Sequence, residues 1–265
     1  YVFNKLTGLF DKMTFANEPL LDQPMGFNVW RAPTDNDRKL KADWYAAHYD
    51  HAATNAYHTE YTVTASGVTL HTHVGIAAIC VQKFLDLDVT WTVANNGSVD
   101  LALHAQRNTV FPELPRFGLR LFLPQEMSQV NYYGMGPMEC YRDKHHAASH
   151  SSYTATVWQL HEDYIRPQEN GSHFDCDYVM LAGDAVRLTA VGTQPFSFNA
   201  SHYTQEELTR KAHNYELEPC GSTVLCLDYA QNGIGSESCG PRLLEQYRLD
   251  DAAFDFGLRL IPEKK

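Results

Sequence analysis

Apolar and polar residues alternate most regularly over residues 85–93, which read LDLDVTWTV and are followed by Asn95-Asn96-Gly97. Successive side chains of a strand point to opposite faces of a sheet, so strict alternation is typical of a strand with one buried face. The Asn-Asn-Gly sequence is typical of a turn. This stretch therefore predicts a half-buried antiparallel strand that ends in a turn.

Similar signals recur at short spacing along the chain. Residues 1–10 predict two short strands around a turn at Thr7-Gly8, and further strands are predicted at residues 68–74, 185–191, 223–229 and 254–260. Several short strands separated by turns are the signature of a sandwich. We therefore expect an all-β chain folded as one large antiparallel β-sandwich.

Two segments predict short helices. Residues 204–212 begin with Thr204 as the N-cap, Glu207 completes a capping box, and two basic residues suit the C-terminal end. A second helix is predicted from Lys41 to Tyr49. No internal repeat or linker rich in Gly or Ser divides the sequence, so one domain is expected over residues 1–265.

The charge balance narrows the classes of partner. The chain carries 32 Asp and Glu against 21 Lys and Arg, a formal net charge of −11, which repels nucleic acid and anionic lipid and leaves neutral ligands as natural partners. No apolar run approaches the roughly 18 residues of a membrane helix, and no signal peptide is visible. Because the chain begins without Met and inside a predicted strand pattern, we expect a fragment of a longer protein.

Cysteine and histidine usage gives no metal site. The six cysteines are spread over the chain without a Cys-x-x-Cys pair, which predicts mostly free thiols and favours a cytoplasmic location. His71 and His73 share a predicted strand face and His145-His146 are adjacent, but neither pair has a third ligand at a matching spacing. No phosphate loop, dinucleotide fingerprint or Gly-x-Ser-x-Gly elbow is present.

The strongest candidate for a site is the loop over residues 30–37, which reads WRAPTDND. Pro33 fixes its own φ, and Asp and Asn favour turns, so this stretch predicts a loop and not a helix or strand. Arg31, Asp35, Asn36 and Asp37 could hold sugar hydroxyls or an ion. The alternative is a surface turn whose acidic side chains cap backbone amides.

Three further segments accompany this loop: residues 133–143 (YGMGPMECYRD), 164–171 (YIRPQENG) and 232–241 (NGIGSESCGP). Two supporting segments are residues 114–118 and 196–203. In this order they resemble the C-terminal domain of the large beta-galactosidases of glycoside hydrolase family two, a domain that also forms most of the small subunit in two-chain versions. The resemblance covers nearly the whole chain.

The resemblance implies a very large sandwich akin to the galactose mutarotase fold, called a supersandwich, and a supporting role in catalysis. In those enzymes the two catalytic glutamates lie in a separate barrel domain, so no catalytic residue, metal or other cofactor is expected here. A divalent cation or sodium ion, if the enzyme has one, is expected to bind in the catalytic domain. The implied partners are the remaining domains or large subunit and a galactoside substrate, and a homo-oligomer of the full enzyme is allowed.

The resemblance also implies which segments border the substrate. Residues 31–37 look like a mobile loop at the pocket, and Ser238 and Cys239 fall where the best-studied relatives place a tryptophan. Cys239 cannot stack on the apolar face of a sugar as an indole can, which puts binding of the leaving group in doubt. The simpler interpretation is that Cys239 is a small residue that fills a turn.

The acidic residues of the other segments are predicted to be structural. Glu139, Tyr141, Arg142 and Asp143 are expected to form an ion-paired corner, because buried charges need partners. The same structural role is expected of three residues in the next segment, where Gly171 would supply a positive φ: Arg166, Glu169 and Asn170. Glycoside hydrolysis needs two carboxyl groups about 5 Å apart for retention, and Glu139 and Glu169 are the candidates if the chain is itself catalytic.

Two other functions stay open. A free-standing mutarotase needs a proton-transferring pair of His or Glu side chains, for which His104, His202 and His213 are available. A carbohydrate-binding module without catalysis would use some of the 15 Tyr and 4 Trp to stack on sugar rings.

Overall fold

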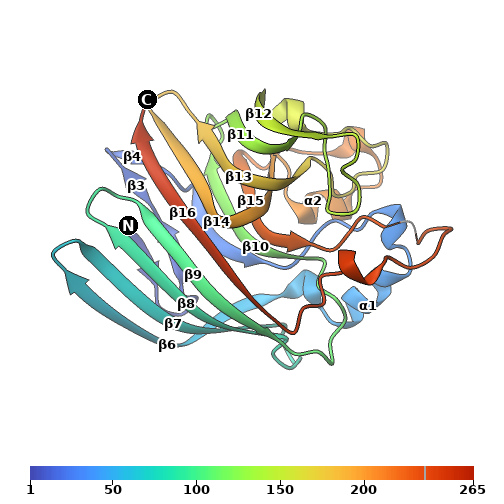
Figure 1. The fold of residues 1–265 in the computed structure, drawn as a ribbon, viewed down its shortest axis with the longest axis horizontal. Coiled ribbons are helices and arrows are strands. Elements are labelled where there is room, and N and C mark those ends of the chain that lie inside the picture. Colours follow the sequence, from blue (N-terminus) through green and yellow to red (C-terminus); the bar gives the residue numbers. More distant parts are fainter. Residues whose placement is uncertain (236) are drawn as a thin grey trace.

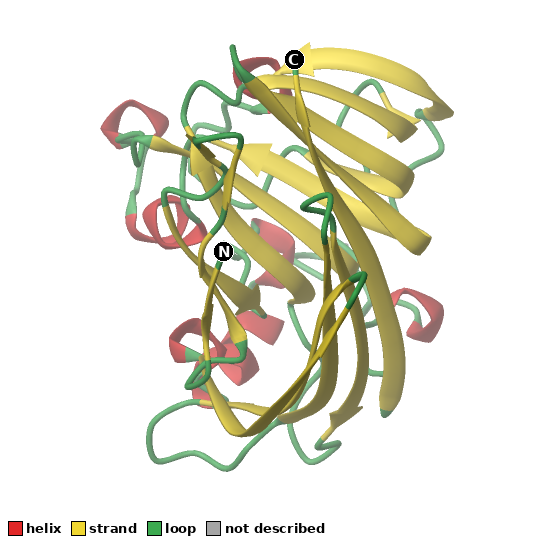
Figure 2. Ribbon diagram, turned by 90° about the vertical axis from the view of Figure 1, so that its left-hand side faces the viewer, coloured by secondary structure: helices red, strands yellow, loops and turns green. Residues whose placement is uncertain are grey.

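The computed structural model describes residues 1–235 and 237–265. The predicted antiparallel β-sandwich is confirmed, because twelve strands join in one strongly curved sheet (Figures 1 and 2). Four short strands form two small separate sheets. The strands are β1 (Val2–Asn4), β2 (Leu9–Lys12), β3 (Thr14–Phe15), β4 (Glu18–Pro19), β5 (Gln23–Asn28), β6 (Ala53–Thr64), β7 (Gly67–Ala77), β8 (Leu85–Ala94), β9 (Val99–Arg107), β10 (Arg116–Pro124), β11 (Gln129–Gly136), β12 (Ser149–Thr156), β13 (Ser172–Ala182), β14 (Val186–Ser201), β15 (Ser222–Gln231) and β16 (Ala253–Lys264).

Strands β8, β9 and β16 have the alternating burial that the sequence predicts. Their apolar residues face the core and their polar residues face outward, as in Val89 paired with Leu103 and Trp91 paired with Leu101. The Trp91 indole Nε1 donates to the carbonyl of Gly8, whose φ of +75° is easily adopted by glycine. The predicted turn at Thr7-Gly8 between β1 and β2 thus packs directly on the core.

Strands β10 and β15 differ, because most of their residues are buried whichever face they point to. In β15 every residue from Ser222 to Asp228 is buried. A strand that is covered on both faces reads as a nearly continuous apolar run, which is what residues 223–227 show. These strands form the inner part of the sandwich.

The sheet forks at β14, a strand that changes partners along its length. Its residues Val186–Gly192 pair with β16, whereas Ser197–Ser201 pair with β15. One branch then continues through β9, β8 and β7 to β6, and the other through β10 to β5. Pro195 lies between the two paired segments, where its missing N–H cannot contribute to either ladder.

Both predicted helices are present as shorter elements: α1 (Leu40–Ala46) and α2 (Gln205–Arg210). Thr204 caps α2, since its hydroxyl accepts from the N–H of Glu207. The predicted capping box is wrong in its second half, because the Glu207 carboxylate instead accepts from the N–H of Glu218 at 3.0 Å. Single 3₁₀ turns occupy Asp35–Asp37, Tyr49–His51, Val157–Leu160, Asn214–Glu216 and Glu245–Tyr247.

Helices α1 and α2 and most long loops lie in the right half of Figure 1, while both chain termini lie on the left. The segment after β5, the segment between β11 and β12, the segment before β13 and the segment after β15 contact one another. These are the four segments that carry the sequence motifs. The fold therefore gathers the motifs in one place, called the loop end below.

Candidate functional site

Hydrogen bonds tie the four loop segments to one another. Asn36 Nδ2 donates to the carbonyl of Gly235 at 2.6 Å, and the Asp143 carboxylate accepts from the N–H groups of Ile234 and Gly235 at 2.9 and 2.8 Å. The N–H of Glu169 donates to the carbonyl of Ala32 at 3.0 Å. Each segment therefore fixes the position of its neighbours.

Arg31 and Asp37 are the buried anchor of the first loop. Arg31 Nη2 lies 2.7 Å from Asp37 Oδ1, and the two side chains are 0% and 3% exposed. Arg31 also donates to the carbonyls of Asn232 and Gly233, and its guanidinium packs on the Trp44 ring. The two charged side chains therefore hold the loop in place and do not face the solvent. The exposed side chain of this loop is Asp35.

A second buried ion cluster lies beneath the loop end. Arg116 donates to Glu169 Oε1 at 2.8 Å and, through Nε and Nη2, to both oxygens of Asp228, and all three side chains are essentially inaccessible. Burial alone would lower the pKa of Arg116, but Asp228 and Glu169 raise it well above its usual range. Burial raises the pKa of Glu169 and of Asp228, and the charge of Arg116 offsets only part of this effect.

Glu139 is the acceptor that joins the second segment to the third. It accepts hydrogen bonds from the hydroxyls of Tyr141 and Tyr164 and from the N–H of Gly171. Burial, followed by the charge of Glu139, raises the pKa of Tyr141 well above its usual value, so that this phenol stays a donor. The predicted positive φ of Gly171 is confirmed at +68°, and a Cβ there would lie 2.4 Å from the carbonyl of Leu160.

The predicted ion-paired corner is wrong in its bonding. Among the described residues, Glu139, Arg142 and Asp143 form no salt bridge with one another, and hydrogen bonds to other loops replace the expected pairs. Arg142 Nη1 donates to the carbonyl of Arg248 at 3.2 Å. The reason is that Glu139 and Asp143 accept charge-assisted hydrogen bonds from backbone N–H groups of neighbouring loops, so that neither carboxylate is left without a donor.

In the third segment the two charged side chains separate. Glu169 turns inward to Arg116, whereas Arg166 is exposed and has no hydrogen bond or ion pair within the described part of the chain. Asn170 is buried, with Oδ1 accepting from the N–H of Glu162 and Nδ2 donating to the carbonyl of Gln168. Asn170 therefore holds the shape of this loop, whereas Arg166 makes no comparable contact within the described part of the chain.

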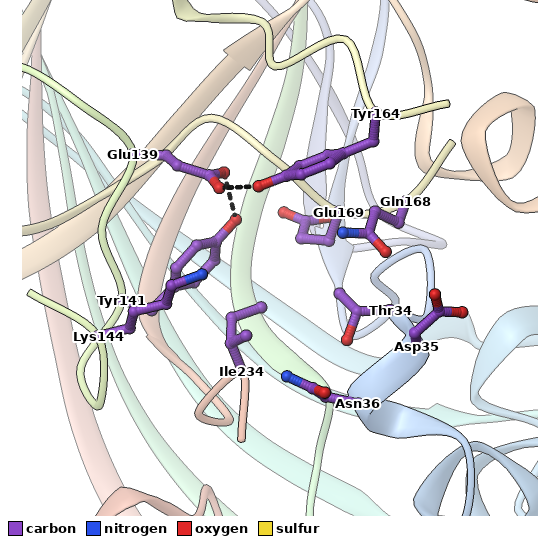
Figure 3. Close-up of a pocket in the computed structure, with 10 residues that line it drawn as sticks. All are labelled: Thr34, Asp35, Asn36, Glu139, Tyr141, Lys144, Tyr164, Gln168, Glu169 and Ile234. Carbon is purple, nitrogen blue, oxygen red and sulfur yellow. Dashed lines mark hydrogen bonds between the residues drawn. The ribbon is translucent and has the colours of Figure 1, made fainter. Parts of the chain in front are cut away.

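A polar pocket of about 190 Å³ lies between these segments (Figure 3). Asp35 is exposed and Asn36 half-buried on one side of it, and Glu139, Tyr141 and Tyr164 form the other side. The full lining is Thr34, Asp35, Asn36, Glu139, Tyr141, Lys144, Tyr164, Gln168, Glu169 and Ile234. This set offers hydroxyl, amide, ammonium and carboxylate groups, as recognition of a polyhydroxylated ligand requires.

Sequence reasoning did not single out Lys144, Tyr164 or Gln168, although the last two lie inside a quoted motif. It also missed the Arg116–Asp228 pair. The available signal was one carboxylate, Asp228, within an otherwise apolar strand, because a buried charge requires a partner. By contrast Ser238 is half-buried and Cys239 exposed, and neither is among the described residues that line the pocket.

The histidines are dispersed. His73 lies between Asp86 and Asp88 at 2.9 and 3.0 Å, and within residues 1–235 and 237–265 no group of three His, Cys, Asp or Glu side chains is placed to hold a metal. The three mutarotase candidates have separate surroundings: His104 contacts Asp255, His202 contacts the carbonyl of Ser222, and His213 stacks on Tyr215. All six cysteines are free thiols, as predicted.

None of the helices in the described parts of the chain has the length and apolar character needed to cross a membrane.

Fold and site together define the class: an antiparallel β-sandwich protein that builds a polar pocket from the loops at one end. A family model described as "Beta galactosidase small chain" matches residues 1–260, and the chain belongs to that family. It is 43% identical over 264 residues to a protein named Beta-galactosidase from Actinobacillus pleuropneumoniae and 38% identical over 260 residues to one of the same name from Staphylococcus xylosus.

These matches cover 100% and 98% of this chain but only 26% of each relative, so the chain spans about a quarter of the length of the curated relatives it matches. Among solved structures, a galactose mutarotase-like protein from Lactobacillus casei is similar at a TM-score of 0.49 and 11% identity, covering 98% of this chain and 96% of that one.

Proposed function

We propose that this chain is the C-terminal part of a family-two beta-galactosidase, which packs on a catalytic barrel and completes the galactoside pocket of a retaining hydrolase. The observation that carries the proposal is the convergence of all four sequence motifs on one pocket, at the mouth of which Asp35 is exposed. Membership of the beta-galactosidase small chain family and the names of the relatives support it.

The bonding of the acidic residues supports a positioning role over a catalytic one. Glu139 and Glu169 both line the pocket, but the first accepts three protein hydrogen bonds and the second is paired with Arg116. A retaining glycosidase needs one carboxyl group that donates a proton and one that attacks the sugar. We infer that both groups are supplied by the remaining domains, and that the isolated chain does not cleave galactosides.

In this proposal the rigid anchor and the exposed tip of the first loop have different tasks. The Arg31–Asp37 pair and the Asn36–Gly235 hydrogen bond set the position of the loop. Asp35 is then free to meet a sugar hydroxyl or a residue of the catalytic domain. Ser238, which is half-buried, and the exposed Cys239 would face the leaving-group side, where a cysteine gives no aromatic platform.

Loop variants in the complete enzyme test this proposal. Asp35→Ala and Asn36→Ala should each lower kcat/KM for a chromogenic galactoside by about tenfold, the value of one charge-assisted or buried hydrogen bond. Thermal stability should change little in Asp35→Ala because that side chain is exposed, and Asn36→Ala should lose at most the contribution of the Asn36–Gly235 hydrogen bond. Asp184→Ala is the matched control, in an exposed turn beside the C-terminal Lys265. Unchanged kcat/KM in both loop variants would contradict the proposal.

A further inference from the structure

The fork in the sheet leaves an opening beside β14. Because Val186–Gly192 pair with β16 and Ser197–Ser201 pair with β15, residues 193–196 pair with neither strand in the registers of the described residues. The strand opposite is also irregular, since the register of β13 shifts on both sides of Cys176. Side chains of the three diverging strands therefore border a space that no ladder fills.

That space is a pocket of about 240 Å³, a little smaller than the roughly 300–1,000 Å³ of pockets for drug-sized ligands. It shares only Tyr141 with the pocket of the loop end. Its remaining lining comes from Arg142, from the start of β13, from residues 194–197 of β14 and from the end of β15: Ser172, Phe174, Asp175, Gln194, Pro195, Phe196, Ser197, Tyr229, Ala230 and Gln231. Polar groups and aromatic rings thus line the same small cavity.

Most of these polar side chains have donors or acceptors that form no hydrogen bond within the described residues. Within the described residues, neither the Asp175 carboxylate nor the hydroxyls of Ser197 and Tyr229 have a hydrogen-bond partner. Within the described residues, the Arg142 side chain donates only through Nη1, to the carbonyl of Arg248. The Gln194 side chain donates only through Nε2, to the carbonyl of Asp255. A ligand in the pocket would therefore meet both free donors and free acceptors.

Asp175 is held in place by the backbone. Its φ of +55° is in the left-handed region, which is uncommon for any residue except glycine, although Asp and Asn are enriched there. The conformation belongs to the irregular part of β13, and the carbonyl of Asp175 lies 3.0 Å from His150 Nε2. The irregular backbone of β13 thus places Asp175 beside the part of β14 where the sheet forks.

The charges of the pocket select its ligand. Arg142 and Asp175 are the only charged side chains among the described lining residues, and their opposite charges cancel. The pocket therefore has no net charge that would favour a cation or an anion over a neutral ligand. A sugar hydroxyl can accept from Arg142 and donate to Asp175 in the same site, and the rings of Phe174 and Tyr229 suit its apolar face.

From this geometry we propose that the fork of the sheet is a second carbohydrate-binding site, which takes one neutral monosaccharide unit, either free or at the end of an oligosaccharide. It is separate from the pocket of the loop end and does not depend on the function proposed for that pocket. A neutral sugar can use both charged side chains as hydrogen-bond partners, whereas a charged sugar meets one side chain of its own sign.

The test is a calorimetric titration of the complete enzyme with D-galactose and D-glucose, compared with galacturonate and galactosamine as charged probes. Asp175→Gly removes the carboxylate in a residue type that adopts positive φ without strain. It should remove or weaken by at least about tenfold one binding component for the neutral sugars, since a hydrogen bond to a charged group is lost. Tyr229→Phe, which deletes one hydroxyl, should weaken the same component by less.

Asp184→Gly is the matched control and should keep every component. Galactoside turnover should be unchanged in Asp175→Gly, which separates a failure here from a failure of the loop-end proposal. Crystals of the enzyme soaked in D-galactose should show the sugar between Arg142 and Asp175. Identical titrations of wild type and Asp175→Gly, or tighter binding of galacturonate or galactosamine than of galactose, would overturn the proposal.

Discussion

Two arginine–aspartate pairs link neighbouring strands of the same sheet in contrasting surroundings. Arg259 of β16 donates through two nitrogens to both oxygens of Asp100 on β9, with side chains 58% and 35% exposed. Arg116 of β10 makes the same kind of two-nitrogen contact with Asp228 of β15, with both side chains 0% exposed. The chemistry is the same, and only the surroundings differ.

The comparison shows where the molecule depends on its charges. On strands β8, β9 and β16, called the outer sheet below, polar side chains face water and apolar ones face the core, so an exposed ion pair there contributes little to stability. At the loop end, Arg31, Arg116 and their carboxylate partners are removed from water and must satisfy one another. The outer sheet supplies stability, and the loop end uses that stability to hold polar groups around a pocket.

Arg116→Met gives the largest expected effect. It leaves Glu169 and Asp228 buried without their guanidinium, and removal of one partner of a buried pair costs about 3–5 kcal/mol. The free energy of unfolding from denaturant titration should fall by that amount. If the single variant does not fold, the triple variant Arg116→Met, Glu169→Gln, Asp228→Asn should recover folding, because no uncompensated charge remains. A loss of unfolding free energy below about 1 kcal/mol would show that the buried Arg116–Asp228 pair contributes no more than the exposed Arg259–Asp100 pair.

His173 provides the second test, through pH. Its ring is 1% exposed, stacks on Phe198 and lies 3.1 Å from the Tyr132 hydroxyl, and burial lowers the pKa of His173 from 6.5 to about 4. Between pH 6.5 and about 4, His173 is therefore protonated in the unfolded chain but neutral in the folded chain. Stability from this residue is complete above pH 6.5 and is lost as the pH falls through 4, by roughly 3 kcal/mol in total.

His173→Phe keeps an aromatic ring and removes the titration. Denaturant unfolding at pH 7, 5.5 and 4 should give a shallower decrease of the unfolding free energy in the variant than in the wild type. The difference between the two proteins isolates His173, because acidic groups with shifted pKa values, such as Glu169, contribute to both. Parallel curves would show that the buried ring is not the source of the pH dependence.

Arg259→Met gives the smallest expected effect and completes the comparison. Exposed ion pairs contribute about 0–1 kcal/mol, so the unfolding free energy should change by less than 1 kcal/mol. Added salt should reduce even that difference, because exposed charges are screened within about 10 Å at 0.1 M ionic strength. A loss as large as that of Arg116→Met would mean that the outer-face pair is itself structural.

The sequence predicted the outer sheet well because the relevant signal is local. Alternation over residues 85–93 and 254–260 depends only on which face each side chain occupies, and the structure has strands there. The fork at β14 could not be predicted, because a change of partner depends on pairings with residues far away in the chain. The capping box at Glu207 failed for a related reason, since the N–H of Glu218 competes for its carboxylate.

At the loop end the sequence located the segments but not their bonds. The four motifs were found from residue type and order, and they do come together. The partners of Glu139 and Glu169 were missed because Tyr164 is 25 and Arg116 53 positions away. Buried polar networks are specified by tertiary geometry, which leaves only an indirect signal in sequence, such as Asp228 in an apolar strand.

The central claim is that the loop end completes a galactoside site that the remaining domains cannot complete alone. The most direct measurement is hydrolysis of a chromogenic galactoside by the separately purified remaining domains, with and without this chain. Our account predicts that activity appears only when the chain is added, and that the chain by itself is inactive. Equal activity of the remaining domains with and without the chain would contradict it.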